Sequence, residues 1–223
     1  MSKFNVRILA EIAIFAAIGF VLDVLQGGIW KAAFANGESI GLAMVPVFII
    51  CYRRGLVPGL LCGLILSLVQ MLPGIYVINQ HSLSGWKGTA GPAIQVMLDY
   101  VLGYTVVGFA GAFSGLYHKA ENKGTKVLWI IVGCAIGSLL KYACHVASGC
   151  FFWPGEMWGV SGYAYSFLYN GLYCIPNMII CTTVMVLVAV FYPVFIEEPE
   201  QKVSENVFAD NKDVSTINTQ EVK

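Results

Sequence analysis

The chain has 223 residues, of which 57% are hydrophobic and only 12% are charged, and its formal net charge at pH 7 is zero. Soluble domains are about one-quarter charged, so this composition excludes an ordinary soluble protein and predicts an integral membrane protein in contact with the lipid bilayer. The zero net charge gives no reason to expect nucleic acid as a partner.

Six apolar segments follow one another along the chain, each identified with a window of about twenty residues. They run over residues 6–25, 40–52, 56–72, 92–117, 127–152 and 167–196. The second segment is short for a full membrane span, and Pro46 within it predicts a kinked helix. We therefore expect an all-α integral membrane protein in which residues 1–196 form one substrate-binding domain of six transmembrane helices. Residues 197–223 are polar, which predicts a disordered C-terminal tail.

Basic residues in the loops predict which side of the membrane each end of a helix faces. They gather before the first segment and in the loops after the second and fourth, at Lys3, Arg7, Arg53, Arg54, Lys119, Lys123 and Lys126. The loops on the opposite side carry only Lys31 and Lys87. The positive-inside rule therefore places both termini in the cytoplasm, and it places the loops at 73–91 and 153–165 outside.

The seven cysteines are scattered, mostly within apolar segments. No CxxC pair occurs, and no group of cysteine and histidine has the spacing of a zinc site. The cysteines are therefore interpreted as small packing residues, and neither a metal nor a cofactor is expected.

The fifth apolar segment carries two ionisable residues, Lys141 and His145, at membrane depth. Such residues are costly in a bilayer, so they are expected to face the interior of a helix bundle or a cavity. On a helix, Tyr142, His145 and Gly149 stand at i, i+3 and i+7 and share one face. Polar and aromatic side chains follow at Trp153, Tyr165 and Asn170. Aromatic faces around the gap left by a glycine predict a pocket for a flat, cationic or polar aromatic molecule.

A carboxylate, that of Asp99, interrupts the fourth apolar segment next to Tyr100. An isolated carboxylate is too costly to bury without a partner or a function, so Asp99 needs a cation. Two partners remain open at this point. One is Lys141, in a structural ion pair within the protein, and the other is a cationic ligand from outside.

In the first segment, Ala13 and Ala17 stand at i and i+4 and form a stripe of small residues. Such a stripe lets another helix approach closely, and that helix is either one of the protein's own or one of a partner subunit. In the outer loops, Trp30 and Glu38 fit either a lid over a pocket or an interfacial anchor. Together with Trp86, they are left out of the predicted site.

Five stretches of the chain resemble one known family. They read KFNVRILAEIAIFAA, SIGLAMVPVFIICYRRGL, MLDYVLGYTVVGFAG, LLKYACHVASGCFFW and YAYSFLYNG. They are similar to the thiamine-specific substrate-binding (S) components of energy-coupling-factor (ECF) transporters, the ThiT/YuaJ family. The resemblance extends from Lys3 to about Ile196.

The resemblance implies a membrane fold of six helices with a thiamine pocket near the outer surface. The family's substrate-binding positions fall on Asp99, Tyr100, Lys141, Tyr142, His145, Gly149, Trp153, Tyr165 and Asn170. Its small-residue motif for docking the transmembrane coupling subunit falls on Ala13 and Ala17. The implied function is high-affinity capture of thiamine from outside, with import driven by that subunit and two ATP-binding cassette ATPases.

Two other functions were weighed against this one. A stand-alone proton- or cation-coupled carrier would use Asp99 and His145 as a relay, although no inverted repeats are visible in the sequence. An intramembrane enzyme is disfavoured because the sequence lacks HExxH, Gly-x-Ser-x-Gly and paired carboxylates on one helix. The chain is therefore predicted not to be an enzyme.

Overall fold

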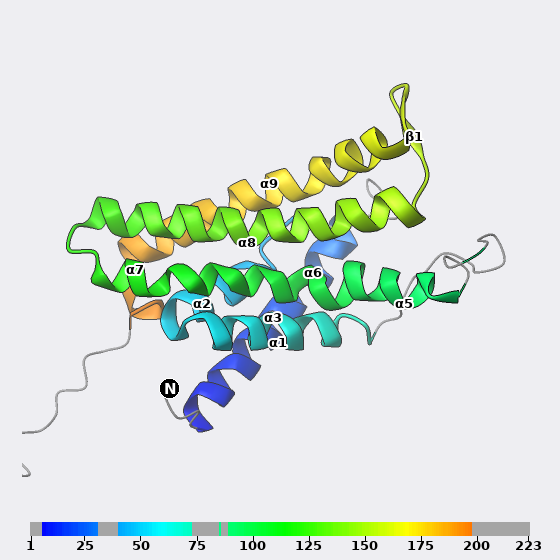
Figure 1. Cartoon of the computed structure of the whole chain (residues 1–223). Coiled ribbons are helices and arrows are strands. Elements are labelled where there is room, and N and C mark those ends of the chain that lie inside the picture. Colours follow the sequence, from blue (N-terminus) through cyan, green and yellow to red (C-terminus); the bar gives the residue numbers. More distant parts are fainter. Residues whose placement is uncertain (1–5, 31–39, 73–84, 86–88, 198–223) are drawn as a thin grey trace, which may run out of the picture.

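The computed structural model describes residues 6–30, 40–72, 85 and 89–197, and these residues are almost entirely helical (Figure 1). In chain order, the α-helices are α1 (Val6–Trp30), α2 (Val45–Arg54), α3 (Leu56–Val69), α5 (Gly91–Val96), α6 (Leu102–Thr105), α7 (Ser114–Lys119), α8 (Lys123–Phe152) and α9 (Gly162–Phe191). A π-helical turn and two 3₁₀ segments complete the helical elements, at η2 (Met97–Val101), η3 (Val106–Phe113) and η4 (Pro193–Phe195). Two short antiparallel strands lie between α8 and α9, at β1 (Glu156–Met157) and β2 (Val160–Ser161).

Several helices are suited to a lipid environment. Among the described residues, four stretches are long and apolar enough to cross a bilayer, at Val6–Gly27, Gly91–Lys119, Lys123–Phe152 and Gly162–Phe191. Large Leu, Ile, Val and Phe side chains are exposed along these helices, as expected where a helix faces lipid. The fold is therefore that of a multi-pass helical membrane protein. Each of the six apolar segments predicted from the sequence contains part of this helical structure.

The core forms around α2, in which every residue from Val45 to Tyr52 is buried. Helices α1 and α3 and the segment η3 pack against it, and the Tyr52 hydroxyl donates a 2.6 Å hydrogen bond to the Trp129 carbonyl of α8. The kink predicted at Pro46 is wrong. Pro46 lies in the first turn of α2, where its missing N–H has no intrahelical acceptor to lose, so the proline starts the helix rather than bending it.

The fourth apolar segment is one continuous but irregular rod made of α5, η2, α6, η3 and α7 (Figure 1). Glycines allow η3 to approach α3 at backbone distance. A Cβ on Gly108 would lie 2.5 Å from the Leu60 backbone nitrogen, and a Cβ on Gly111 would lie 2.7 Å from the Gly55 carbonyl carbon. The small residues of this segment therefore serve packing within the protein.

The basic residues meet at one end of the bundle, together with both ends of the described chain (Figure 1). Glu11 of α1 accepts hydrogen bonds from Arg54 Nε at 2.6 Å, from Arg54 Nη2 at 2.7 Å and from Arg53 Nε at 3.2 Å. Arg53 Nη1 also donates to the Val194 carbonyl at 2.9 Å. These bonds join α1, α2 and the turn that follows α9.

A second ion pair holds Glu197, the first residue of the predicted tail. Its carboxylate accepts hydrogen bonds from Lys126 Nζ at 2.7 Å and from the Tyr117 hydroxyl at 3.1 Å. The rest of the predicted tail, residues 198–223, lies outside the described part of the chain.

We expect the Glu197→Gln variant to be less stable than the parent protein near pH 7, and we expect this difference to disappear as the pH falls well below 4.5. The hydrogen bond from Lys126 lowers the pKa of the Glu197 carboxyl below its ordinary value of 4.5. A lowered folded-state pKa stabilises the fold above the ordinary value, and this contribution is lost as the pH falls through the folded-state pKa. Because the side chain is 37% exposed, the difference should stay below about 1 kcal/mol. Thermal unfolding of both proteins in detergent measures it, and a difference that does not change with pH would contradict the expectation.

Candidate functional site

Asp99 lies in the π-helical turn η2 and is the centre of a polar cluster. Its Oδ2 accepts hydrogen bonds from Ser148 Oγ at 2.7 Å and from Trp153 Nε1 at 3.2 Å. Its Oδ1 lies 3.5 Å from His145 Nδ1. These neighbours belong to α8 or follow it directly, so one helix presents a row of polar groups to the carboxylate.

The backbone on both sides explains how the cluster is held. A π-helical turn widens the helix locally, and such turns occur frequently at functional sites. Trp153 follows the last residue of α8, and its backbone N–H donates to the Gly149 carbonyl at 3.2 Å. The indole is thereby fixed at the end of the helix that carries His145 and Ser148. The Asp99 side chain remains 18% exposed, so the carboxylate is not sealed off.

His145 directs one ring nitrogen toward Asp99 and has an unused nitrogen on the other side. Within the described part of the chain, His145 Nε2 is buried and makes no hydrogen bond. The ring meets the Tyr173 ring edge-on, with 6.2 Å between centroids, and the His145 side chain is only 10% exposed. A buried polar atom without a partner is costly, so this nitrogen is available to a polar atom of a ligand.

Lys141 is directed toward a different group. The residue is 2% exposed, and its Nζ lies 3.4 Å from the centroid of the Tyr104 ring. The Tyr104 hydroxyl donates a 3.0 Å hydrogen bond to Asp23 Oδ1 of α1. Lys141, one of the two partners that the sequence leaves open for Asp99, therefore directs its ammonium toward an aromatic ring, and that ring is hydrogen-bonded to a second carboxylate.

Gly149 allows α9 to approach α8 at the level of the site. A Cβ on Gly149 would lie 3.1 Å from both Asn170 Nδ2 and Ser166 Cβ. Asn170 is buried, and its Nδ2 donates to the Ser166 carbonyl at 2.8 Å while its Oδ1 accepts from the Tyr173 hydroxyl. Asn170 is thus placed at the helix interface, beside the His145 side of the cluster.

The other predicted positions are tyrosines with different surroundings. Tyr165 lies on α9, which begins at Gly162 and thus before the predicted start at residue 167, and its ring stacks on Tyr169 with centroids 5.5 Å apart. The Tyr142 hydroxyl donates to the Phe167 carbonyl at 2.9 Å, so Tyr142 links α8 to α9. Tyr100 is half-buried in η2, next to Asp99 in the chain.

The structure adds polar residues that the sequence analysis missed, namely Asp23, Tyr104, Ser148, Ser166 and Tyr173. Ser148 stands three residues after His145 within an apolar segment, and this spacing is a usable signal. The bond between Tyr104 and Asp23 joins residues 81 positions apart, and no local pattern indicates it.

The stripe of Ala13 and Ala17 lies on the exposed side of α1. Ile14 and Ile18 on the same side are 57% and 44% exposed. Of the two alternatives for this stripe, packing against the protein's own helices does not occur among the described residues. Trp86, Glu38 and the side chain of Trp30 lie outside the described part of the chain.

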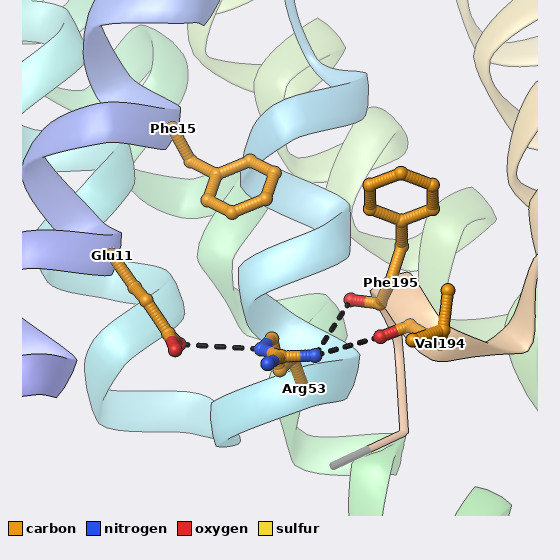
Figure 2. Close-up of a pocket in the computed structure, with 5 residues that line it drawn as sticks. All are labelled: Glu11, Phe15, Arg53, Val194 and Phe195. Carbon is orange, nitrogen blue, oxygen red and sulfur yellow. Dashed lines mark hydrogen bonds and ion pairs between the residues drawn. The ribbon is translucent and has the colours of Figure 1, made fainter. Parts of the chain in front are cut away.

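A pocket of 290 Å³ lies at the basic end of the bundle, and Figure 2 shows its lining. Phe15, Val194 and Phe195 form apolar walls, and Glu11 and Arg53 form its polar part. These two charged groups pair with each other, and Arg53 is further satisfied by backbone carbonyls. The pocket is thus lined by a structural ion pair, and the cluster around Asp99 is the candidate functional site. Asp99 belongs to η2, which joins α5 to α6 toward the end of the bundle that carries β1 (Figure 1).

A carboxylate, an imidazole and an indole lie together between the helices of this multi-pass protein. This arrangement is typical of a membrane transporter for a small polar molecule. Residues 9–197 match the family described as thiamine transporter protein (Thia_YuaJ). The chain belongs to this family of thiamine transporters. Its role is transport rather than catalysis, and its location is the plasma membrane.

Individual relatives agree with the family match. The chain is 34% identical over 196 residues to the thiamine transporter ThiT of Bacillus subtilis (strain 168), which covers 86% of this chain and 94% of the relative. It is 24% identical over 168 residues to ThiT of Lacticaseibacillus paracasei, covering 74% and 77% of the two chains. A solved structure of ThiT from Listeria monocytogenes superimposes with a TM-score of 0.71 at 25% identity, covering 86% of this chain and all of that one.

Proposed function

We propose that this protein is the thiamine-binding subunit, or S component, of an ECF-type importer. The observation that carries the proposal is the cluster around Asp99, where a partly exposed carboxylate lies beside His145 and Trp153 within a membrane-spanning bundle. Thiamine carries a permanent positive charge on its thiazolium ring, a hydrogen-bonding aminopyrimidine and a hydroxyl group. A carboxylate, an unsatisfied imidazole nitrogen and aromatic faces match these features.

The roles of the residues follow from their chemistry. Asp99 balances the positive charge of the ligand or accepts hydrogen bonds from its amino group. Trp153 and Tyr165 offer aromatic faces for stacking, and His145 Nε2 offers a free ring nitrogen. Tyr100 and Asn170 supply further polar edges. Lys141, Tyr142 and Gly149 complete the proposed site.

Titration with thiamine tests the proposal directly. The purified protein in detergent should show saturable quenching of tryptophan fluorescence at submicromolar thiamine, because a ligand stacked near Trp153 changes the surroundings of its indole. The response should be lost in Trp153→Phe and strongly weakened in His145→Ala. Trp158→Phe is the matched control, since Trp158 is 76% exposed on the turn between β1 and β2 and should leave the titration unchanged. An absent response in the parent protein would overturn the proposed function.

We further propose six transmembrane helices with both termini in the cytoplasm. The gathering of Arg7, Arg53, Arg54 and Lys126 at the end where the described chain begins and finishes supports this orientation. The Asp99 site then lies toward the exterior, as capture of an external vitamin requires. The sequence contains no GxxxxGK[ST] phosphate loop, so ATP hydrolysis is assigned to two partner ATPases acting through a transmembrane coupling subunit.

Replacing both Ala13 and Ala17 with tryptophan is expected to abolish assembly with the coupling subunit while leaving thiamine affinity within about twofold of the parent value. The two alanines lie on the exposed side of α1, where bulky side chains prevent close helix approach without disturbing the Asp99 cluster. Co-purification of co-expressed subunits and a thiamine titration measure the two effects. Leu139→Trp, at a position 50% exposed on α8, is the control. An intact complex would contradict the docking role, and thiamine uptake by the chain alone would support a carrier instead.

A further inference from the structure

Lys141, Tyr104 and Asp23 form a row of side chains that crosses three helices, with the buried charge of Lys141 at one end and the half-buried carboxylate of Asp23 at the other. Lys141 of α8 and Tyr104 of α6 are each 2% exposed, and the ammonium nitrogen lies 3.4 Å from the ring centroid. The Tyr104 hydroxyl donates to Asp23 of α1 at 3.0 Å. Gln26 Nε2, 3.3 Å from the same carboxylate oxygen, orients Asp23 from within α1.

This arrangement compensates a charge that is otherwise costly to bury. An ammonium loses its hydration in the bundle, and the face of an aromatic ring replaces part of it. The hydrogen bond from the phenol to Asp23 brings negative charge to the far edge of the ring, which strengthens the attraction of the ring for Lys141. The formal charges of Lys141 and Asp23 cancel, so the row as a whole is neutral.

Lys141 lies close enough to the Asp99 cluster for its charge to affect a ligand. A Cβ on Gly103 would lie 3.8 Å from His145 Nε2 and 3.9 Å from Lys141 Nζ, so the imidazole and the ammonium are neighbours. The other nitrogen of this imidazole is 3.5 Å from Asp99 Oδ1. An uncompensated ammonium on the same side of Gly103 as this imidazole would repel a bound cation and attract the carboxylate that the cation requires.

We propose that Asp23 and Tyr104 are positioning residues for the binding of a cationic ligand. They hold and neutralise Lys141, so that the negative charge of Asp99 remains available. The single negative charge of Asp99 then matches a ligand with one positive charge. This inference rests on the proposed function, because it takes thiamine as that ligand.

The first experiment needs no ligand and tests whether Asp23 neutralises the charge of Lys141. Asp23→Asn should lower the unfolding temperature of the unliganded protein in detergent by about 5 °C. Adding Lys141→Met to this variant should restore most of the loss, because the charge that Asp23 compensates is then absent. Glu156→Gln, which removes an exposed carboxylate from β1, should leave the unfolding temperature unchanged. Equal effects of Asp23→Asn with and without Lys141 would overturn the proposal.

The second experiment measures selectivity for charge. The probes are thiamine and a neutral analogue in which a thiophene replaces the thiazolium ring. Asp23→Asn should weaken thiamine binding about tenfold and analogue binding by less than about threefold. Asp23→Glu should recover most of the affinity, and Tyr104→Phe should resemble Asp23→Asn more weakly, since it removes only the hydroxyl that links ring and carboxylate.

The outcomes separate this proposal from the function on which it rests. If the parent protein binds no thiamine, the proposed function fails, whereas the unfolding cycle still decides whether Asp23 neutralises Lys141. If the parent binds thiamine and Asp23→Asn weakens both probes equally, the role of Asp23 is structural and the inference is overturned. A loss confined to thiamine that disappears in the Lys141→Met background supports it.

Discussion

Asp99→Asn is expected to weaken thiamine binding by about 100-fold while the yield of folded protein stays nearly unchanged. Asparagine keeps the size of the side chain, and its amide oxygen can still accept the hydrogen bonds from Ser148 and Trp153. The variant loses only the negative charge that faces the ligand. Because the carboxylate is held in a largely desolvated bundle, this charge interacts with a bound cation more strongly than it would in water. Fluorescence titration in detergent gives the affinity, and size-exclusion chromatography gives the folded yield.

Ser148→Ala is the matched control for this prediction. It removes a hydrogen bond to the same carboxylate oxygen but leaves the charge in place. We expect a loss of affinity of about tenfold, which is the lower end of the range for one hydrogen bond to a charged group. Equal affinities of the parent and Asp99→Asn proteins would show that the carboxylate does not pair with the cation.

Gly149→Ala is expected to destabilise the protein by about 1–3 kcal/mol and to weaken thiamine binding by about tenfold. The added methyl group would meet the Ser166 hydroxyl, and it would lie 3.1 Å from Asn170 Nδ2. Helices α8 and α9 must then separate, and this movement displaces His145 and Asn170 relative to each other. Thermal unfolding in detergent and a thiamine titration measure the two effects.

The same substitution at Gly115 provides the comparison. No atom lies within 4 Å of the position that a Gly115 Cβ would occupy in α7. Since alanine favours helix more than glycine does, Gly115→Ala should be as stable as the parent or up to about 1 kcal/mol more stable. If Gly149→Ala and Gly115→Ala had equal stability, the close approach of α9 to Gly149 would not be a constraint.

Hydropathy predicted the helical membrane fold because long apolar segments leave few alternatives to helices in a bilayer. The sequence predicts the local backbone geometry within these segments less well. A proline inside an apolar segment predicts a kink, but Pro46 lies in the first turn of α2. The start of this helix is set by burial among α1, α3 and η3, and no local capping signal marks it. The π-helical turn at Asp99 was not foreseen, since a change from i−4 to i−5 bonding leaves no clear trace in residue pattern.

The candidate site also combines features that the sequence predicts with features that depend on how the helices pack. Helical periodicity and the cost of buried charge point to Asp99, His145 and Trp153 as site residues, and the structure places these three side chains together. The sequence leaves the partner of Asp99 open between Lys141 and a ligand, because the choice depends on how α1, α6 and α8 meet in space. Tyr104 and Asp23 are separated by 81 residues, and only the packed bundle brings them into contact.

The groups that surround Asp99 belong to one helix and to the residue that follows it. Their mutual distances are set when that helix forms, before any ligand arrives. A receptor of this kind loses little conformational entropy on binding, so a larger share of the interaction free energy remains as affinity.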